Sequence, residues 1–509
     1  MNYDKSQRQE QIRDHIHTMR QKHRIHAPDF PMGLEWLNTA APLTKADLHG
    51  KIVILDFWTY CCINCMHVIP DLKYLEDKYR NEPLVVIGVH SAKFFNEKEK
   101  ENIRQAVLRY DVKHPVVNDL NMEIWQLYAV RAWPTLMIID PEGYLIATFS
   151  GEGNRELLDN YIEVALDIYG KADKLNRIPL HLQPEILDQP NEVLSYPGKI
   201  LADEENNRLY ISDSNHNQIV VTDLDGRIEE IVGCGIIGKQ DGAFNEASFF
   251  HPQGMALYHG DLLVADMENH LIRKVDFKNH TVTTIAGTGE QAKIFNIPGV
   301  GREVALNSPW DLFVMGGLVF IAMAGSHQIW VMDMNTLRLE PFAGTGQEAR
   351  IDGPRMEAAF AQPSGLTGDG KFLYVADSEI SCVRSINLET GEVQTVVGGN
   401  LFQFGDEDGQ GDFVRLQHPL GLAYRDGIMY LADTYNHKIK RIWPQTQECK
   451  SWLGTRKPGG KDSTSPQFYE PSGLAFTANR LYIADTNNHK IRIVDLKSAA
   501  VLTLKIKGV

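Results

Sequence analysis

The chain has 509 residues, of which 43% are hydrophobic and 23% charged, and its formal net charge is −15. This length exceeds one compact core, and the acidic balance argues against binding to nucleic acid or to an anionic membrane surface. No run of about 18 consecutive apolar residues is present, and the polar N-terminus lacks the apolar segment of a signal peptide. We therefore expect a cytoplasmic protein of several domains.

The first third of the chain predicts a helical extension and then an α/β domain. Residues 1–34 form the extension, with a helix to about residue 24 whose apolar stripe (Ile12, Ile16, Met19) is expected to dock on its own domain. Over residues 35–170 short apolar runs alternate with helical segments, which is typical of an α/β sandwich. The expected elements are strands at 52–58 and 84–89, helices at about 62–79, 97–109 and 154–169, and a hairpin over 136–147. Residues 171–195 contain three prolines and predict a stiff connector.

From residue 196 to residue 509 a short pattern recurs six times. Each copy is an apolar run that ends in Asp, or in Met323 in the third copy, and the ends lie 52 to 57 residues apart. A period near 50 residues marks an array of similar units, and four short strands per unit with no helical periodicity favour a six-bladed β-propeller.

These repeats resemble the NHL family. Asn269-His270-Leu271 spells the motif that names the family, and the other five copies depart from it to different degrees. The corresponding pairs are His216-Asn217, Ser326-His327, Ile380-Ser381, Asn436-His437 and Asn488-His489. The repeated Asp and His side chains are expected to tie strands together by hydrogen bonds. The acidic run 405–412 is expected to be a loop, since its spacing does not match an EF-hand.

Cys62 and Cys65 form a Cys-x-x-Cys motif directly after an apolar strand and at the start of a predicted helix. The first sulfur would lie at the helix N-terminus, where free N–H groups and the helix dipole stabilise a thiolate. The second lies one turn later, where it could resolve a mixed disulfide formed on Cys62. Cys61 is expected to be a spectator because adjacent cysteines bridge poorly, although it could also act as a third redox thiol.

Residues 46–150 resemble thioredoxins, more closely their membrane-tethered and peroxiredoxin-related branches. Asp56 matches the buried acid of that family, Pro70 the proline in the active-site helix, and Trp133-Pro134-Thr135 the segment with a cis proline. The resemblance implies that Asp56 shuttles a proton to or from Cys65 and that Pro134 aligns the substrate backbone. The whole chain resembles the NHL-repeat-containing thioredoxin-like proteins.

The leading functional hypothesis is a thiol–disulfide oxidoreductase whose propeller recruits a protein substrate or partner. No cofactor, metal, nucleic acid or membrane is expected to take part. The catalytic candidates are Cys62, Cys65, Asp56 and Pro134, with Cys61, Trp133 and Thr59 as possible auxiliary residues.

Two alternatives remain open at this point. One is a non-catalytic interaction scaffold in which the dithiol is shielded. The other is a thiol peroxidase, in which Thr59-x-x-Cys62 supplies the peroxidatic cysteine and Arg131 stabilises its thiolate. In each case the long inter-blade loops are expected to gather on one face of the propeller, where recognition would lie.

Overall fold

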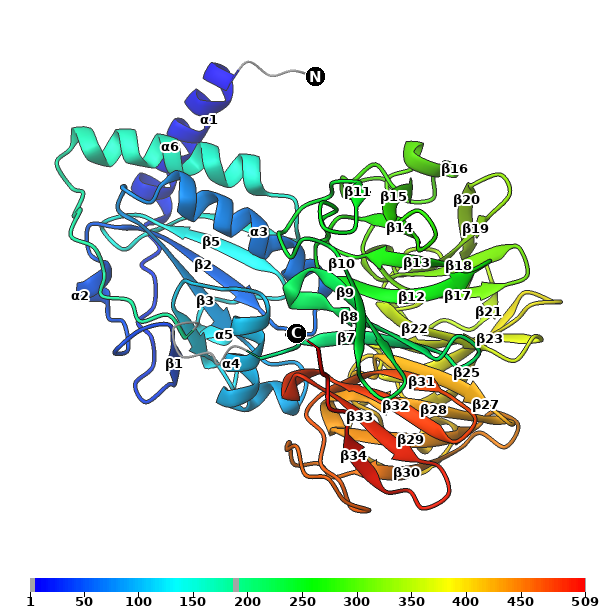
Figure 1. Cartoon of the computed structure of the whole chain (residues 1–509). Helices are drawn as coiled ribbons and strands as arrows, with labels where there is room; N and C mark the ends of the chain where they lie inside the picture. Colours follow the sequence, from blue (N-terminus) through cyan, green and yellow to red (C-terminus); the bar gives the residue numbers. More distant parts are fainter. Residues whose placement is uncertain (1–4, 186–191, 509) are drawn as a thin grey trace. The chain divides into compact units, whose positions relative to one another are not determined.

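The computed structural model describes residues 5–185 and 192–508, and the chain divides into two compact units, residues 1–190 and 191–509 (Figure 1). The first unit is an α/β domain and the second a six-bladed β-propeller, as the sequence predicts. Within the described residues, no helix has the length and hydropathy needed to cross a membrane.

The first unit is built on a six-stranded sheet with strand order β1-β4-β3-β2-β5-β6. Strands β2, β3 and β4 run parallel, and β1, β5 and β6 pair antiparallel to their neighbours. The strands are β1 (Trp36–Leu37), β2 (Ile52–Trp58), β3 (Leu84–His90), β4 (Val116–Asn118), β5 (Thr135–Ile139) and β6 (Leu145–Ser150). The helices are α1 (Lys5–Thr18), which a π-helical turn (Met19–His23) continues, α2 (Lys45–Leu48), α3 (Ile63–Lys78), α4 (Lys100–Arg109), α5 (Glu123–Leu127) and α6 (Arg155–Lys171). The sequence analysis did not identify the four short elements β1, β4, α2 and α5.

Both faces of this sheet are covered, which explains why β2 is a continuous apolar run. Ile52 and Ile54 pack on one face with residues of α1, α3 and α6, and Ile12 and Ile16 of α1 belong to the same cluster. The N-terminal stripe therefore docks on its own domain, as predicted. The opposite face packs against α5 and the segment before α2.

Part of the segment predicted as a connector lies along the first unit. Lys51 Nζ donates to the carbonyl oxygen of Asn176 at 3.1 Å, and Arg104 Nε donates to Glu185 at 2.8 Å. Residues 186–191 of the connector lie outside the described residues.

The six sheets of the second unit follow one another in chain order. Blade one contains β7 (Pro197–Asp203), β8 (Arg208–Asp213), β9 (Gln218–Asp223) and β10 (Ile228–Val232). Blade two contains β11 (Gly242–Ala243), β12 (Pro252–Tyr258), β13 (Asp261–Asp266), β14 (Leu271–Asp276) and β15 (Thr281–Ala286), and blade three β16 (Gly299–Val300), β17 (Pro309–Met315), β18 (Leu318–Met323), β19 (Gln328–Asp333) and β20 (Arg338–Ala343). Blade four contains β21 (Gly353–Pro354), β22 (Pro363–Gly368), β23 (Phe372–Asp377), β24 (Cys382–Asn387) and β25 (Glu392–Gly398), and blade five β26 (Gly409–Gln410), β27 (Gly421–Arg425), β28 (Ile428–Asp433), β29 (Lys438–Trp443) and β30 (Glu448–Gly454). Blade six contains β31 (Pro471–Phe476), β32 (Arg480–Asp485), β33 (Lys490–Asp495) and β34 (Val501–Thr503).

Four blades differ from the predicted four-stranded unit. In blades two to five the preceding inter-blade loop adds a two-residue fifth strand, which pairs with the outer strand of the blade. A strand of two residues is too short to show an alternating pattern, so the sequence does not reveal it.

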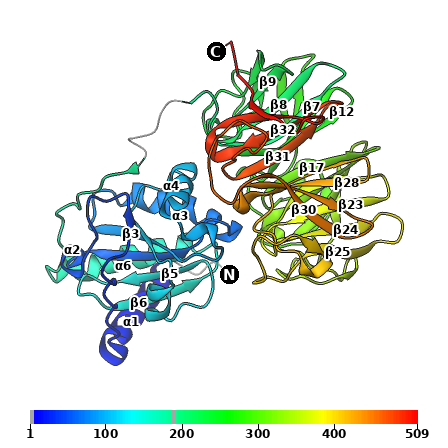
Figure 2. The same cartoon turned by 90° about the horizontal axis from the view of Figure 1, so that it is seen from below.

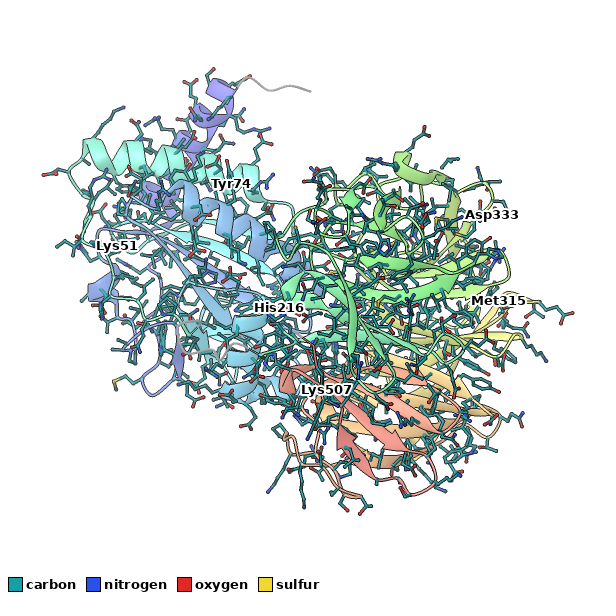
Figure 3. All side chains as sticks on the ribbon, in the orientation of Figure 1. Lys51, Tyr74, His216, Met315, Asp333 and Lys507 are labelled. Carbon is teal, nitrogen blue, oxygen red and sulfur yellow. The ribbon has the colours of Figure 1, made fainter. Side chains whose placement is uncertain are left out.

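The propeller closes where blade six meets blade one. Strand β31 lies beside β7, so the red end of the chain adjoins its green segment in both views (Figures 1 and 2). The last described residues also pair with blade one, since the N–H of Ile228 donates to the carbonyl of Lys507 at 2.9 Å. Lys507 is labelled in Figure 3. Closure of this kind removes the exposed sheet edges that an open array would present.

The second residue of the NHL motif links each blade to the next. In all six blades it has a φ between 52° and 59°, and its side chain accepts the N–H of a residue at the start of the following blade at 3.0 to 3.1 Å. The acceptor and donor pairs are Asn217 and His251, His270 and Ser308, His327 and Gln362, Ser381 and His418, His437 and Glu470, and His489 and Tyr196. The expected hydrogen-bonding role of the repeated His is confirmed, and it acts between blades.

In blades two, five and six the first residue of the motif is an Asn that donates to the aspartate of its own blade. Asn269, for example, donates to Asp266 at 2.8 Å. Blade one reverses the pair without losing either role, because His216 Nδ1 bonds Asp213 at 2.8 Å while Asn217 links to the next blade.

In blades two, four, five and six the aspartate also pairs with a buried cation, whereas Asp213 of blade one bonds His216 and Gln218. Arg273, Arg384 and Arg492, each seven residues after the Asp of its blade, pair with it at 2.7 to 3.1 Å. Lys440 takes this place in blade five and also pairs with Asp406 of the acidic run. In blade three the Asp is Met323 and the cation position is Trp330, both buried. The two changes belong together, since either charge alone would be buried without its partner.

One of these links makes the stability of the propeller depend on pH. Burial lowers the pKa of His437 from 6.5 to about 4, so the folded protein keeps this ring neutral while the unfolded chain binds a proton below about pH 6.5. Its contribution is present above pH 6.5 and is lost as the pH falls towards 4, by about 3 kcal/mol in total. Denaturant unfolding of the propeller between pH 7 and 4 should show a smaller loss in His437→Asn, which keeps an acceptor as Asn217 does. Equal losses in both proteins would contradict this assignment.

Candidate functional site

The Cys-x-x-Cys motif lies in the turn that joins the end of β2 to α3. Cys62 is the N-cap of α3 and is half-buried, and its carbonyl accepts the N–H groups of Cys65 and Met66, both at 3.1 Å. Cys65, one turn into the helix, is only 1% exposed. The two sulfurs therefore differ in access, with Cys62 the one that a large substrate could reach.

Cys65 lies above a buried carboxyl group. Burial, a hydrogen bond with Cys62 and the nearby charge of Asp56 raise the pKa of the Cys65 thiol well above its usual value. Burial also raises the pKa of Asp56 to about 7, against a smaller opposing effect of His114. A carboxyl group with a pKa near neutral can accept a proton and return it at physiological pH, which is what a thiol as weakly acidic as Cys65 requires.

Pro134 lies at the same end of the strands as the dithiol. The Trp133–Pro134 peptide is cis, and Thr135 pairs with Phe57 across the antiparallel strands β5 and β2. Pro134 is therefore level with the residue that ends β2. Trp133 is held there by its indole N–H, which donates to the carbonyl of Ser91 at 3.0 Å.

Glu97, which the sequence analysis did not select, fixes the turn before Cys62. Its side chain is completely buried. Oε1 accepts the hydroxyl of Thr59 at 2.8 Å and the N–H of Cys61 at 2.9 Å, while Oε2 accepts the N–H groups of Lys93 and Phe94 at 3.1 and 2.8 Å. Thr59 and Cys61, two of the auxiliary candidates, are thus tied to one carboxylate.

His90 holds the other side of this turn. Its Nε2 accepts the N–H of Tyr60 at 3.3 Å, and its ring stacks on the Tyr60 ring with centroids 5.4 Å apart. Burial lowers the pKa of His90 to about 3, so it remains a neutral acceptor at physiological pH.

Glu97→Gln should loosen this turn. A glutamine keeps one acceptor oxygen but directs an NH₂ group at either the Thr59 and Cys61 donors or the Lys93 and Phe94 donors. Leaving a buried donor unpaired costs about 1–3 kcal/mol. We expect an earlier unfolding transition of the first unit and a changed rate of Cys62 alkylation by iodoacetamide. The exposed neighbour gives the control, since Glu99→Gln should change neither measurement.

Sequence comparisons identify the protein family of both units. Residues 50–145 match a family described as Thioredoxin-like, and residues 468–494 match the NHL repeat. "NHL repeat-containing protein 2" of Bos taurus is 44% identical over 514 residues, which cover 93% of this chain and 70% of that protein. The chain belongs to the NHL repeat-containing protein 2 family.

Two further relatives extend the comparison. "Protein SUPPRESSOR OF QUENCHING 1, chloroplastic" of Arabidopsis thaliana is 47% identical over 507 residues, which cover 95% of this chain and 48% of the relative. The chain thus spans about half the length of this relative. The "Thiol-disulfide oxidoreductase ResA" of Bacillus cereus is 30% identical over 117 residues, 23% of this chain and 65% of that protein. Similarity to an oxidoreductase over the N-terminal domain supports a redox-related role for this member of the NHL repeat-containing protein 2 family.

Proposed function

We propose that this chain is a cytoplasmic thiol–disulfide oxidoreductase in which Cys62 and Cys65 exchange electrons with a protein substrate that the propeller recruits. The observation that carries the proposal is the difference between the two sulfurs. The half-buried Cys62 caps the active-site helix, and the buried Cys65 lies above an acid whose pKa is raised to about 7.

In the reducing direction the Cys62 thiolate attacks a substrate disulfide and forms a mixed disulfide, and one substrate sulfur leaves as a thiolate. Asp56 then takes the proton of Cys65, and the Cys65 sulfur attacks Cys62. The Cys62–Cys65 bond forms while the Cys62–substrate bond breaks, and its electron pair leaves with the second substrate sulfur. The substrate gains two electrons and the dithiol loses two. Pro134 aligns the substrate backbone next to the dithiol, at this end of the strands.

The other two hypotheses gain less support. A peroxidatic Cys62 would need the Thr59 hydroxyl as a donor to peroxide, but that hydroxyl donates to Glu97. Arg131, its suggested thiolate stabiliser, is exposed. A shielded dithiol would suit a scaffold, whereas Cys62 is half-buried and within reach of solvent.

Recruitment of a protein by the propeller rests on its inter-blade loops. These loops carry large apolar side chains that are exposed to solvent, namely Ile236, Ile237, Ile294, Ile297, Phe402 and Phe413. Exposed apolar groups of this size on rigidly held loops are typical of protein-binding surfaces.

The test is a redox titration of the purified chain in which trapped thiols are counted by mass spectrometry. A reversible Cys62–Cys65 disulfide with a potential of roughly −200 to −300 mV, near the glutathione poise of the cytosol, would support exchange. Absence of this disulfide at every accessible potential would overturn the proposal.

A further inference from the structure

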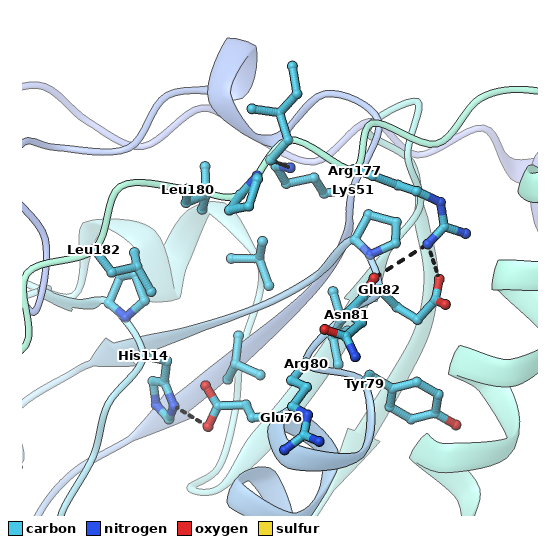
Figure 4. Close-up of a pocket in the computed structure, with 17 residues that line it drawn as sticks. Lys51, Glu76, Tyr79, Arg80, Asn81, Glu82, His114, Arg177, Leu180 and Leu182 are labelled. Carbon is cyan, nitrogen blue, oxygen red and sulfur yellow. Dashed lines mark hydrogen bonds and ion pairs between the residues drawn. The ribbon is translucent and has the colours of Figure 1, made fainter.

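Asp56 lies at one end of a chain of polar groups that reaches a surface pocket of the first unit. The pocket has a volume of about 410 Å³, and its lining includes Glu76 of α3, Arg80 in the turn after α3, the start of β3, His114 and the segment 177–182 (Figure 4). Figure 4 shows the side chains of His114 and Glu76 pointing toward each other at the pocket. His114 is 3% exposed, whereas the Glu76 side chain is 28% exposed. The pocket therefore brings solvent to Glu76 and leaves His114 between Glu76 and the core.

The space between Asp56 and His114 lies over Gly88. Asp56 and Gly88 are register partners in the parallel strands β2 and β3, so their side-chain positions share one face of the sheet. A Cβ at position 88 would lie 3.5 Å from His114 Nε2 and 2.9 Å from Trp58 Nε1. Val116 Cγ2 would lie 3.2 Å from the same position, so the absence of a side chain at Gly88 lets these three groups pack close to the backbone beside Asp56. Asp56 Oδ1 and Trp58 Nε1 are both buried there without a hydrogen-bond partner in the structure.

The surrounding backbone sets the direction in which His114 points. Its carbonyl accepts the side-chain amide of Asn38 at 2.9 Å, and the N–H of Gly88 donates to the Pro115 carbonyl at 2.9 Å. His114 Nδ1 lies 3.2 Å from Glu76 Oε2. A neutral ring that donates from Nδ1 to this carboxylate has its lone pair on Nε2, towards Gly88.

Cys65, which gives up the proton, and Glu76, which lies at the pocket, are on the same face of helix α3. Glu76 follows Cys65 by 11 residues, about three helical turns, so the two side chains lie on the same side of α3. Two of the three basic groups that line the pocket have other partners, since Lys51 Nζ donates to the carbonyls of Asn176 and Ile178, and Arg177 pairs with Glu82 at 2.7 Å. The third is Arg80. The charged and titratable groups that face His114 are Asp56 on β2 and Glu76 on α3, with Cys62 and Cys65 beyond Asp56.

We propose that Asp56, His114 and Glu76 form a proton relay that joins the Cys65 thiol to the water of this pocket. When Cys65 attacks the mixed disulfide, its proton goes to Asp56. The proton passes beside Gly88 to His114 Nε2 through one water molecule, while His114 passes its Nδ1 proton to Glu76, which releases it to solvent. The Cys65 and Cys62 sulfurs bond, and the departing sulfur keeps the electron pair of the broken bond. His114 and Glu76 act through Asp56 and do not touch the substrate. This inference rests on the proposed function.

The test separates the two chemical steps with 5,5′-dithiobis(2-nitrobenzoic acid) as the disulfide probe. All variants carry Cys234→Ser, because Cys234 is an exposed thiol that would react with the probe. Attack by Cys62 releases the first nitrothiobenzoate, and attack by Cys65 releases the second. We expect His114→Gln to slow the second phase at least tenfold at pH 7 and leave the first phase unchanged. Glu76→Gln should slow it less, because water can replace the half-exposed carboxylate.

Chemical rescue distinguishes a proton carrier from a packing residue. In His114→Gly, millimolar imidazole should restore the second phase in proportion to its concentration, since the pocket gives it access to the vacated position. Arg80→Gln, on the same pocket wall, is the matched control and should leave both phases unchanged. A second phase with the parent rate and pH profile in His114→Gln, or no response of His114→Gly to imidazole, would overturn the relay. If the parent itself shows no second phase, the proposed function falls and the relay falls with it.

Discussion

Cys62→Ser is expected to abolish disulfide exchange, while Cys65→Ser should keep the first attack and stop at a stable mixed disulfide. The physical reason is the asymmetry of the site. Cys62 is half-buried at the N-terminus of α3 and can meet a substrate, whereas Cys65 is 1% exposed and can react only with a sulfur already bonded to Cys62. A serine hydroxyl has no accessible anionic form at neutral pH and cannot replace either thiolate. Insulin reduction coupled to dithiothreitol measures turnover, and mass spectrometry identifies the trapped adduct.

Two further cysteines make this experiment specific. Cys234→Ser is the matched control, since Cys234 is exposed in the propeller and should contribute nothing to turnover. Cys61→Ser tests the alternative of a third redox thiol. Cys61 is completely buried and its N–H is held by Glu97, so we expect its replacement to leave the trapped adduct on Cys62. Retained turnover in Cys62→Ser would show that the roles assigned to the dithiol are wrong.

The parts of the site that could be predicted from the sequence are those whose signal is local. Cys62 and Cys65 lie shortly after the apolar strand β2, and Trp133-Pro134 immediately precedes Thr135, the first residue of another buried strand. The repeats are equally clear, because six copies agree in register. Even the reversed pair His216-Asn217 keeps both roles of the motif, since what matters is one polar group for the Asp and one acceptor for the next blade.

The residues that the sequence could not identify act over long separations. Glu97 lies 36 residues from Cys61 and belongs to a charged stretch typical of a solvated surface. Only the fold shows that its carboxylate is buried and accepts four donors. His114 likewise reaches Glu76 across 38 residues. Nothing in the sequence marks Gly88 as the position that lets His114 Nε2 approach the backbone beside Asp56.

Arg384→Leu should destabilise the propeller by about 3–5 kcal/mol, the range for removal of one partner from a buried ion pair. The Arg384 guanidinium is fully buried and donates to Asp377 at 3.1 Å and to Asp352 at 2.6 Å. It also donates to the carbonyls of Ala359 and Ile351. Without it the buried Asp377 has no countercharge, whereas the partly exposed Asp352 can turn to water. Hydrogen exchange of the full chain over β23 and β24, in a denaturant series, measures the loss.

A double variant based on blade three tests whether the unpaired charge of Asp377 causes the loss of stability in Arg384→Leu. There Met323 and Trp330 stand at the positions of Asp377 and Arg384, and both are buried in the core of a complete blade. The double variant Asp377→Met/Arg384→Trp removes the carboxylate together with the cation and should recover a large part of the stability lost in Arg384→Leu. Lys371→Leu, a change at an exposed cation of the same blade, should cost less than about 0.5 kcal/mol. If the double variant were as unstable as Arg384→Leu, loss of packing and of the hydrogen bonds to the two carbonyls would explain the effect. The paired replacement in blade three would then reflect shape and not charge.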